Sequence, residues 1–224
     1  MIVAFTSEKP EHFDFSVTLP WFPGELIAQA LGVAPGTLPM LSRLGDLSIV
    51  PAALPADLAL TVDNAFSVQT DQLSLDTYAG GTARPVTVEH IASLADISLF
   101  VLDVEPRGMR EPHWHTNASE FNYCVAGTAQ IGIVAPDGSS QTFVVEPGNV
   151  AYIPANWFHY IASVSDEPLR FLVFFGNVKP DHIDLSQVAV FFPSEVLAAS
   201  FDLDPAVFAD LPKQGDVFVA APPK

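Results

Sequence analysis

Hydrophobic and polar positions follow two different patterns along this chain. Between residues 66 and 176, short runs of alternating or β-branched residues are separated by turn-forming pairs that contain glycine. Alternation with a period of two is typical of a strand with one buried face. Many short strands divided by turns indicate an antiparallel sandwich or barrel. The clearest runs are at residues 97–104, 130–134, 142–145 and 169–175.

The segments on either side of this region have helical patterns, and they resemble each other. The run Phe22-Pro23-x-Glu25-x-x-Ala28 reappears without gaps as Phe192-Pro193-x-Glu195-x-x-Ala198, at an offset of 170 residues. A repeat of this kind indicates one barrel flanked by two copies of the same helical cap. It also suggests pairing with a second barrel, and hence a homo-oligomer of two or more copies.

We therefore predict an all-β core with helical extensions at both ends. The expected parts are an N-terminal helical or irregular extension over 1–65, a β-barrel over 66–183 and a C-terminal helical extension over 184–224.

Composition excludes several classes of partner. The 224 residues include 9 Lys+Arg against 26 Asp+Glu, for a formal net charge of −17. Such a field repels nucleic acid and anionic membranes, so neither is expected as a partner. No run approaches the ~20 apolar residues of a membrane span, and the start of the chain has too short an apolar run for a signal peptide. We expect a soluble cytoplasmic protein.

Four residues form a pattern that suits a metal ion. His113 and His115 lie two residues apart, which places both rings on the same face of a strand. Glu120 follows after a short bend, and His159 comes at the start of a later strand. Three imidazoles and one carboxylate projecting into one cavity suit a divalent ion such as Mn, Fe, Ni, Cu or Zn, one per barrel.

These residues resemble the two signatures of the cupin family, G-x5-H-x-H-x3–4-E-x6-G and G-x5-P-x-G-x2-H-x3-N. His113, His115, Glu120 and Gly127 match the first signature, while Gly148, Pro154 and His159 match the second. In three places the sequence departs from the signatures, and none of the three is a ligand position. Arg107 occupies the slot of the first glycine, Asn156 that of the second signature's middle glycine, and Ser163 that of its asparagine.

A narrower resemblance is to the bicupin oxalate decarboxylases. The run from Val104 to His115 is similar to that group's E-P-G-A-M-R-E-L-H-W-H, and the likeness covers roughly residues 20–220. It implies a cupin barrel (a double-stranded β-helix, jelly-roll-like) with manganese as the expected metal. It also implies that Arg110 binds a substrate carboxylate, which a guanidinium can do with two parallel hydrogen bonds. A buried structural ion pair is the alternative role for Arg110.

The loop after the last strand differs from that group. Catalytic barrels there carry a Ser-Glu-Asn-Ser loop whose glutamate handles a proton, whereas residues 176–184 contain no glutamate. Asp181 or His182 could supply the proton if the loop folds over the metal. A solvated loop is the alternative.

The expected function is that of a metalloenzyme, a lyase or an oxidoreductase, that converts a small carboxylate such as oxalate into formate and carbon dioxide. Without a suitable acid, an oxalate oxidase that consumes dioxygen is expected instead. Two further alternatives remain open: a cupin dioxygenase or isomerase with a larger substrate, and a non-catalytic metal-binding cupin.

Overall fold

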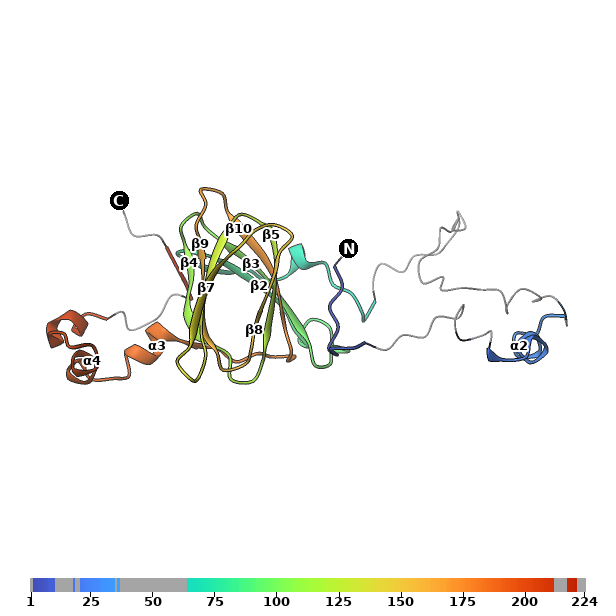
Figure 1. Cartoon of the computed structure of the whole chain (residues 1–224). Helices are drawn as coiled ribbons and strands as arrows, with labels where there is room; N and C mark the ends of the chain where they lie inside the picture. Colours follow the sequence, from blue (N-terminus) through green and yellow to red (C-terminus); the bar gives the residue numbers. More distant parts are fainter. Residues whose placement is uncertain are drawn as a thin grey trace. The chain divides into compact units, whose positions relative to one another are not determined.

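The structure is a computed structural model, and it describes residues 2–10, 18, 21–34, 36, 64–211 and 217–220 (Figure 1). The chain forms two compact units, Met1–Val62 and Asp63–Lys224, which are treated separately below. Most of the predicted N-terminal extension lies outside the described residues. Among those described, no helix is long and apolar enough to span a bilayer.

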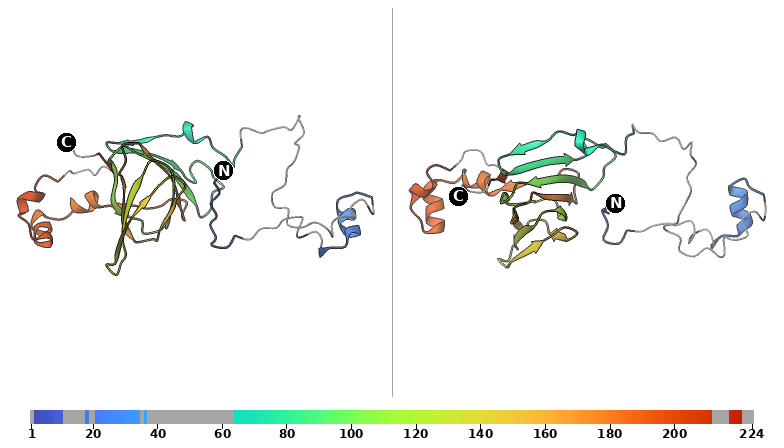
Figure 2. Two further views of the ribbon diagram at one scale, coloured as in Figure 1. Left: turned by 45° about the horizontal axis from the view of Figure 1, so that its top comes forward. Right: turned by 90° about the horizontal axis from the view of Figure 1, so that it is seen from above.

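The second unit contains a barrel of two antiparallel sheets, shown from two further directions in Figure 2. One sheet has the strand order β1-β2-β3-β10-β5-β8, and the other has the order β11-β4-β9-β6-β7, with β12 also paired to β4. The strands are β1 (Asp76–Tyr78), β2 (Gly81–Val86), β3 (Ser98–Val104), β4 (Met109–Trp114), β5 (Glu120–Ala126), β6 (Ala129–Val134), β7 (Ser140–Val145), β8 (Val150–Ile153), β9 (Phe158–Ser163), β10 (Leu169–Phe175), β11 (Ile183–Asp184) and β12 (Phe218–Val219).

The alternating pattern places one face of each main strand inside the barrel. In β10, Leu169, Phe171 and Val173 are buried, while Arg170 between the first two is exposed and pairs with Asp103 on the neighbouring strand β3. Inward side chains from both sheets form a single apolar cluster. The predicted all-β core is therefore present, built as the period-two pattern requires.

Two positions where the sequence departs from the cupin signatures lie in tight turns. Arg107 has φ 62° and Asn156 has φ 67°, both in the left-handed region that favours glycine. Asparagine adopts this conformation more readily than most other residues, so the second replacement is mild. The turns keep the shape that the signature glycines would give them.

The C-terminal extension is helical but not entirely so. After β11 it forms α3 (Leu185–Ala189), α4 (Ser194–Phe201) and the 3-10 helix η4 (Pro205–Phe208). The chain then returns to the barrel as β12, whose Phe218 is almost fully buried. The sequence pattern predicts no strand at either end of this extension, because two residues are too few for a period to show.

The helical repeat reappears in the structure as equivalent backbone geometry. In α2 (Gly24–Ala30), Val33 N donates to Ala28 O, and in α4 Leu203 N donates to Ala198 O. These pairs stand at the same offset of 170 residues. Gly32 and Asp202 are a third pair at this offset. Each lies at the C-terminal end of its helix and has a left-handed backbone conformation, with φ 67° and 54°. The later matched positions of the repeat lie partly outside the described residues.

Candidate metal centre

The fold brings the four predicted ligand residues together inside the barrel. His113 lies on β4 opposite His159 on β9, His115 follows β4 directly, and Glu120 begins β5. All four are buried, and one potential ligand atom from each lies within 4.8 Å of the others. Ligands on opposite sides of a first-row divalent ion, bound at about 2.0–2.2 Å, stand about 4–4.4 Å apart. The spacing of the cluster is close to that range.

Backbone carbonyls orient all three imidazole rings in the same way. Nδ1 of His113 lies 2.7 Å from Glu111 O, Nδ1 of His115 lies 2.6 Å from Asp181 O, and Nδ1 of His159 lies 2.9 Å from Trp157 O. A carbonyl oxygen can only accept, so Nδ1 must carry the proton in each ring. In the neutral rings Nε2 is then an acceptor with a free lone pair, as a metal ligand must be.

Two of the Nε2 atoms lie close to a carboxylate oxygen, which is itself an acceptor. Glu120 Oε2 lies 3.0 Å from His159 Nε2 and 3.1 Å from His115 Nε2. His115 Nε2 has no hydrogen bond of ordinary geometry, although it is fully buried. Neutral rings and an ionised carboxylate would bring only acceptor atoms together at this point of the buried cluster. A divalent cation satisfies such a cluster, so the residues present fit a bound metal.

The protonation states also suit metal ligation. Burial, followed by the nearby charge of Arg110, holds the pKa of His113 well below its usual value. Burial acts to raise the pKa of Glu120, but the His159 and His115 side chains beside its carboxylate outweigh this effect, so this pKa falls well below its usual value. A neutral imidazole and an ionised carboxylate are the ligand forms.

Asn122, to which the sequence assigns no role, supports the cluster. Its Nδ2 donates to Glu120 Oε1 at 2.8 Å, and its side chain is fully buried. The glutamate therefore has one oxygen held by an amide and the other directed at the imidazoles. The only sequence signal for this contact is that Asn122 lies two residues after the ligand Glu120, on the same face of the strand.

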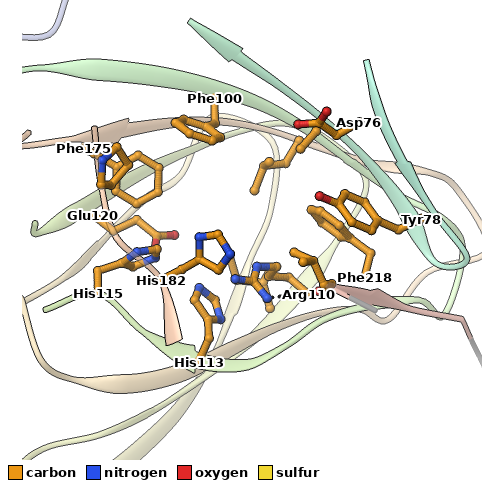
Figure 3. A pocket seen from close by; sticks show the side chains of 15 residues that line it. Asp76, Tyr78, Phe100, Arg110, His113, His115, Glu120, Phe175, His182 and Phe218 are labelled. Carbon is orange, nitrogen blue, oxygen red and sulfur yellow. Dashed lines mark hydrogen bonds and ion pairs between the residues drawn. The ribbon is translucent and has the colours of Figure 1, made fainter. Parts of the chain in front are cut away.

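The cluster opens into a pocket of about 110 Å³, drawn in Figure 3. Its wall is mainly apolar and aromatic, while Arg110, His182 and the cluster residues other than His159 form the polar side (Figure 3). The apolar lining consists of Tyr78, Ala83, Phe100, Leu102, Ile161, Phe175, Pro180, Val217 and Phe218, with Asp76 also present.

Arg110 lines this pocket, and its guanidinium contacts an acid, a backbone carbonyl and an aromatic ring. Its NH1 lies 2.6 Å from Asp184 Oδ1 and donates to Val217 O at 3.1 Å, and its guanidinium carbon is 5.9 Å from the centre of the Phe218 ring. Arg110 thus stands in a buried ion pair, and it also faces the pocket. The two roles considered for it from the sequence are compatible.

The loop places its two predicted proton carriers differently. His182 lines the pocket, with Nε2 3.4 Å from Asp184 Oδ2. Asp181 is exposed and is absent from the lining, and it contributes its backbone: its carbonyl orients His115 and its N–H donates to Asn117 Oδ1 at 2.8 Å. The structure therefore brings the His182 side chain to the pocket, and the Asp181 side chain lies outside the lining.

Two buried acids that the sequence did not single out hold the end of this loop. Asp184 is fully buried behind Arg110 and His182. Glu111 accepts hydrogen bonds from Ser186 N at 3.0 Å and Ser186 Oγ at 2.6 Å at the start of α3. Their pairing depends on which strands become neighbours, which the local sequence pattern does not reveal.

The family model described as Cupin matches residues 69–208, and the chain belongs to this family. The predicted cupin barrel is confirmed by solved structures as well. Oxalate decarboxylase from Bacillus subtilis at pH 4.6 has a TM-score of 0.76 at 26% identity, over 94% of this chain and 57% of that chain. Another structure of the B. subtilis enzyme, with a TM-score of 0.77, is described in terms of its Mn(II) centres.

The curated relatives include two kinds of cupin. Oxalate decarboxylase OxdC of B. subtilis (strain 168) is 38% identical over 107 residues, which is 48% of this chain and 28% of the relative. A probable oxalate decarboxylase of Arthroderma benhamiae is 26% identical over 206 residues, covering 88% of this chain and 51% of the relative. A probable germin-like protein of Arabidopsis thaliana (subfamily 2 member 5) is 28% identical over 133 residues, covering 57% and 62%. The chain thus spans about half or less of the curated oxalate decarboxylases it matches.

Proposed function

We propose that this chain is a metal-dependent cupin enzyme that acts on a small carboxylate, with oxalate as the reference substrate and formate and carbon dioxide as products. One observation carries the proposal: a buried cluster of metal-ligand acceptors opens into a pocket in which an arginine is already oriented. The names of the relatives support the choice of oxalate.

Manganese is the metal we propose, one ion per barrel, held by His113, His115, Glu120 and His159. The Mn(II) centres named for the B. subtilis structure support this choice. The donor set itself also suits Fe, Ni, Cu or Zn, because imidazole and carboxylate ligands accept each of these ions.

The residues around the pocket would act as follows. A bound divalent metal would supply charge stabilisation and one-electron chemistry beside the cluster. Arg110 would hold one substrate carboxylate through its free guanidinium edge, and the aromatic wall would exclude water. Conversion of the oxalate monoanion to formate and carbon dioxide removes a proton from oxygen and returns one to carbon. His182 would return it from Nδ1 while its Nε2 faces Asp184.

An oxalate oxidase is the second candidate, and the loop favours it. Residues 176–184 contain no glutamate, and the Asp181 side chain lies outside the pocket lining. If no proton reached the carbon, dioxygen and one further proton would convert the monoanion into two molecules of carbon dioxide and hydrogen peroxide. The apolar wall would also admit a larger carboxylate, as in other cupin dioxygenases or isomerases. A metal-binding cupin without catalysis is the remaining alternative.

The deciding experiment is turnover of oxalate by the Mn(II)-reconstituted protein, with formate and hydrogen peroxide measured side by side. The expected product is formate, and it should disappear in the His113→Ala variant together with the bound metal. Peroxide without formate would establish the oxidase. Neither product from a protein with stoichiometric metal would reject oxalate as the substrate.

A further inference from the structure

Asp184 is a buried acid with an unusual environment. It lies on β11 in register with His113 of β4, and its side chain has no exposed surface. Neither of its oxygens accepts a hydrogen bond of ordinary geometry from the part of the chain that the structure describes. Its basic neighbours are Arg110, with NH1 at 2.6 Å, and His182, with Nε2 at 3.4 Å.

A simple structural role does not account for this acid. A buried carboxylate is costly to desolvate, so it contributes little to stability compared with an apolar side chain of the same size. The segment around it is already attached by the β11–β4 pairing and by the two hydrogen bonds from Ser186 to Glu111. Asp184 also directly precedes α3, and its side chain makes no capping hydrogen bond to that helix.

Both neighbours of Asp184 line the pocket and come from different elements. Arg110 projects from β4, and His182 projects from the loop before β11 (Figure 3). The Asp184 carboxylate therefore pairs with two side chains of the pocket lining. Apart from the cluster histidines, these two are the only cationic or potentially cationic side chains of the described lining.

The contacts of Arg110 show how the acid selects one edge of the guanidinium. NH1 donates to Val217 O and is also the atom in ion-pair contact with Asp184 Oδ1, so groups of the protein already occupy this nitrogen. A guanidinium has five N–H groups, which leaves Nε and NH2 as the pair that can meet a substrate carboxylate. Held in this way, Arg110 keeps its geometry while part of its charge is neutralised.

We propose that Asp184 is a positioning residue that fixes Arg110 and His182 as one unit beside the metal cluster. The inference rests on the proposed function, because it assigns these two side chains to substrate binding and proton delivery. Asp184 fixes the edge of Arg110 that faces the substrate, weakens its pull on carboxylates so that product leaves, and keeps a proton on His182 Nε2.

The test uses Asp184→Asn, which keeps the shape and removes the charge. Without the competing carboxylate, acetate should bind the Mn(II)-loaded protein about three- to tenfold more tightly. Oxalate turnover should show a lower KM with kcat reduced at least tenfold. A residue that only supports the fold would not improve binding while slowing turnover.

The matched control is Asp103→Asn. Asp103 Oδ1 lies 2.6 Å from Arg170 Nε, so the pair has the same length, but it stands at the surface away from the pocket. This variant should leave acetate affinity, KM and kcat within about twofold of the unmodified chain.

A second readout is independent of oxalate turnover. Nitrogen-15 NMR of the zinc-loaded protein should show His182 as a fixed Nε2–H tautomer, which becomes a mixture in Asp184→Asn. If the unmodified chain itself lacks that tautomer, the proposal is wrong whether or not the variant folds. An unchanged tautomer with KM and kcat unaltered in the variant would also overturn it. If no chain turns over oxalate, the proposed function fails, while tautomer and acetate affinity still decide the role of Asp184.

Discussion

Single atoms determine why the barrel interior suits a cation. Each of the three histidines donates its Nδ1–H to a backbone carbonyl, so Nε2 is unprotonated. The Nε2 atoms of His115 and His159 lie next to the Glu120 carboxylate. The three carbonyls belong to Glu111 in β4, to Trp157 just before β9 and to Asp181 in the loop before β11. Ring orientation is thus built into the backbone before any metal arrives, which is how outer contacts raise the basicity of metal ligands.

The contact between Asn122 and Glu120 gives a prediction at this scale. Asn122→Ala removes the donor to Glu120 Oε1, so the carboxylate is free to rotate away from the imidazoles. Loss of such an outer contact typically lowers metal affinity about 10- to 100-fold. Isothermal titration of the metal-free protein with Mn(II) measures the change. Unaltered affinity would show that the imidazoles alone orient Glu120.

His182 gives a prediction of pH dependence. Burial is the main cause that lowers the pKa of His182 below 6.5; Arg110 and His115 act in the same direction, and Asp184 and Asp181 oppose them. The protonated ring is therefore populated only in acid, as the pH falls through this lowered pKa. Formate production should increase below about pH 6.5 and decline as the pH rises.

The variant that tests this assignment is His182→Gln, which keeps a polar side chain but cannot carry the proton. Its formate production should lose the acidic increase in a plot of kcat against pH. An identical pH profile in this variant would assign the proton to another group.

At the scale of elements, the short strand β12 closes the pocket from a distant part of the chain. Its Phe218 packs against Tyr78 with ring centres 5.4 Å apart, and the preceding Val217 carbonyl accepts from both Arg110 and the backbone of Glu111. Gly80 N donates to Phe218 O at 3.0 Å, so the β1–β2 turn lies directly against this strand.

Gly80→Ala should therefore detach β12. A methyl group at this position would collide with the backbone of Val219, which cannot move without the strand. We expect a loss of about 1–3 kcal/mol in the free energy of unfolding, measured in urea, together with weaker acetate binding as Arg110 loses its support. Gly176→Ala is the control, because its added carbon would lie 3.3 Å from the small Ser119 hydroxyl. Equal stability of the two variants would contradict this account.

The elements differ in how far the sequence could predict them. The long strands follow from alternation, and the ligand residues follow from their spacing around strands β4, β5 and β9. Strand β12 and the buried acid Asp184 could not be predicted in this way, because their roles arise from pairing between distant segments. The Asn122 amide contacts Glu120 only two residues away, but the approach of Glu120 to His159 depends on how distant strands pack. The loop histidine could be named from the sequence, but its approach to the pocket depends on how the backbone of Asp181 is held.

At the scale of the whole molecule, exposed apolar side chains bear on whether the chain forms a homo-oligomer. In α2 and its surroundings Trp21, Phe22 and Leu31 are exposed, and around α4 Phe191 and Phe201 are exposed as well. The net charge of −17 opposes association of like chains, so any assembly must rest on apolar contacts. Exposed apolar side chains on both copies of the repeat support our proposal of a homo-oligomer.

Light scattering after size-exclusion chromatography tests this proposal. The unmodified chain should run as a dimer or larger assembly, and the Phe191→Ser, Phe201→Ser double variant should dissociate. Both side chains are more than half exposed, at 84% and 61%, so the barrel should keep its thermal stability. A monomeric unmodified chain at micromolar concentration would reject the oligomer.

The equivalence of the two caps has a consequence for how such chains can grow. Because α2 and α4 share their hydrogen-bond pattern and their left-handed ends, one cap could serve as the exit of a first barrel and as the entrance of a second. A gene duplication joined at that point would need no new linker, and its product would be a tandem protein with a period of about 170 residues. Single-barrel and double-barrel cupins would then differ by one recombination event within a helix.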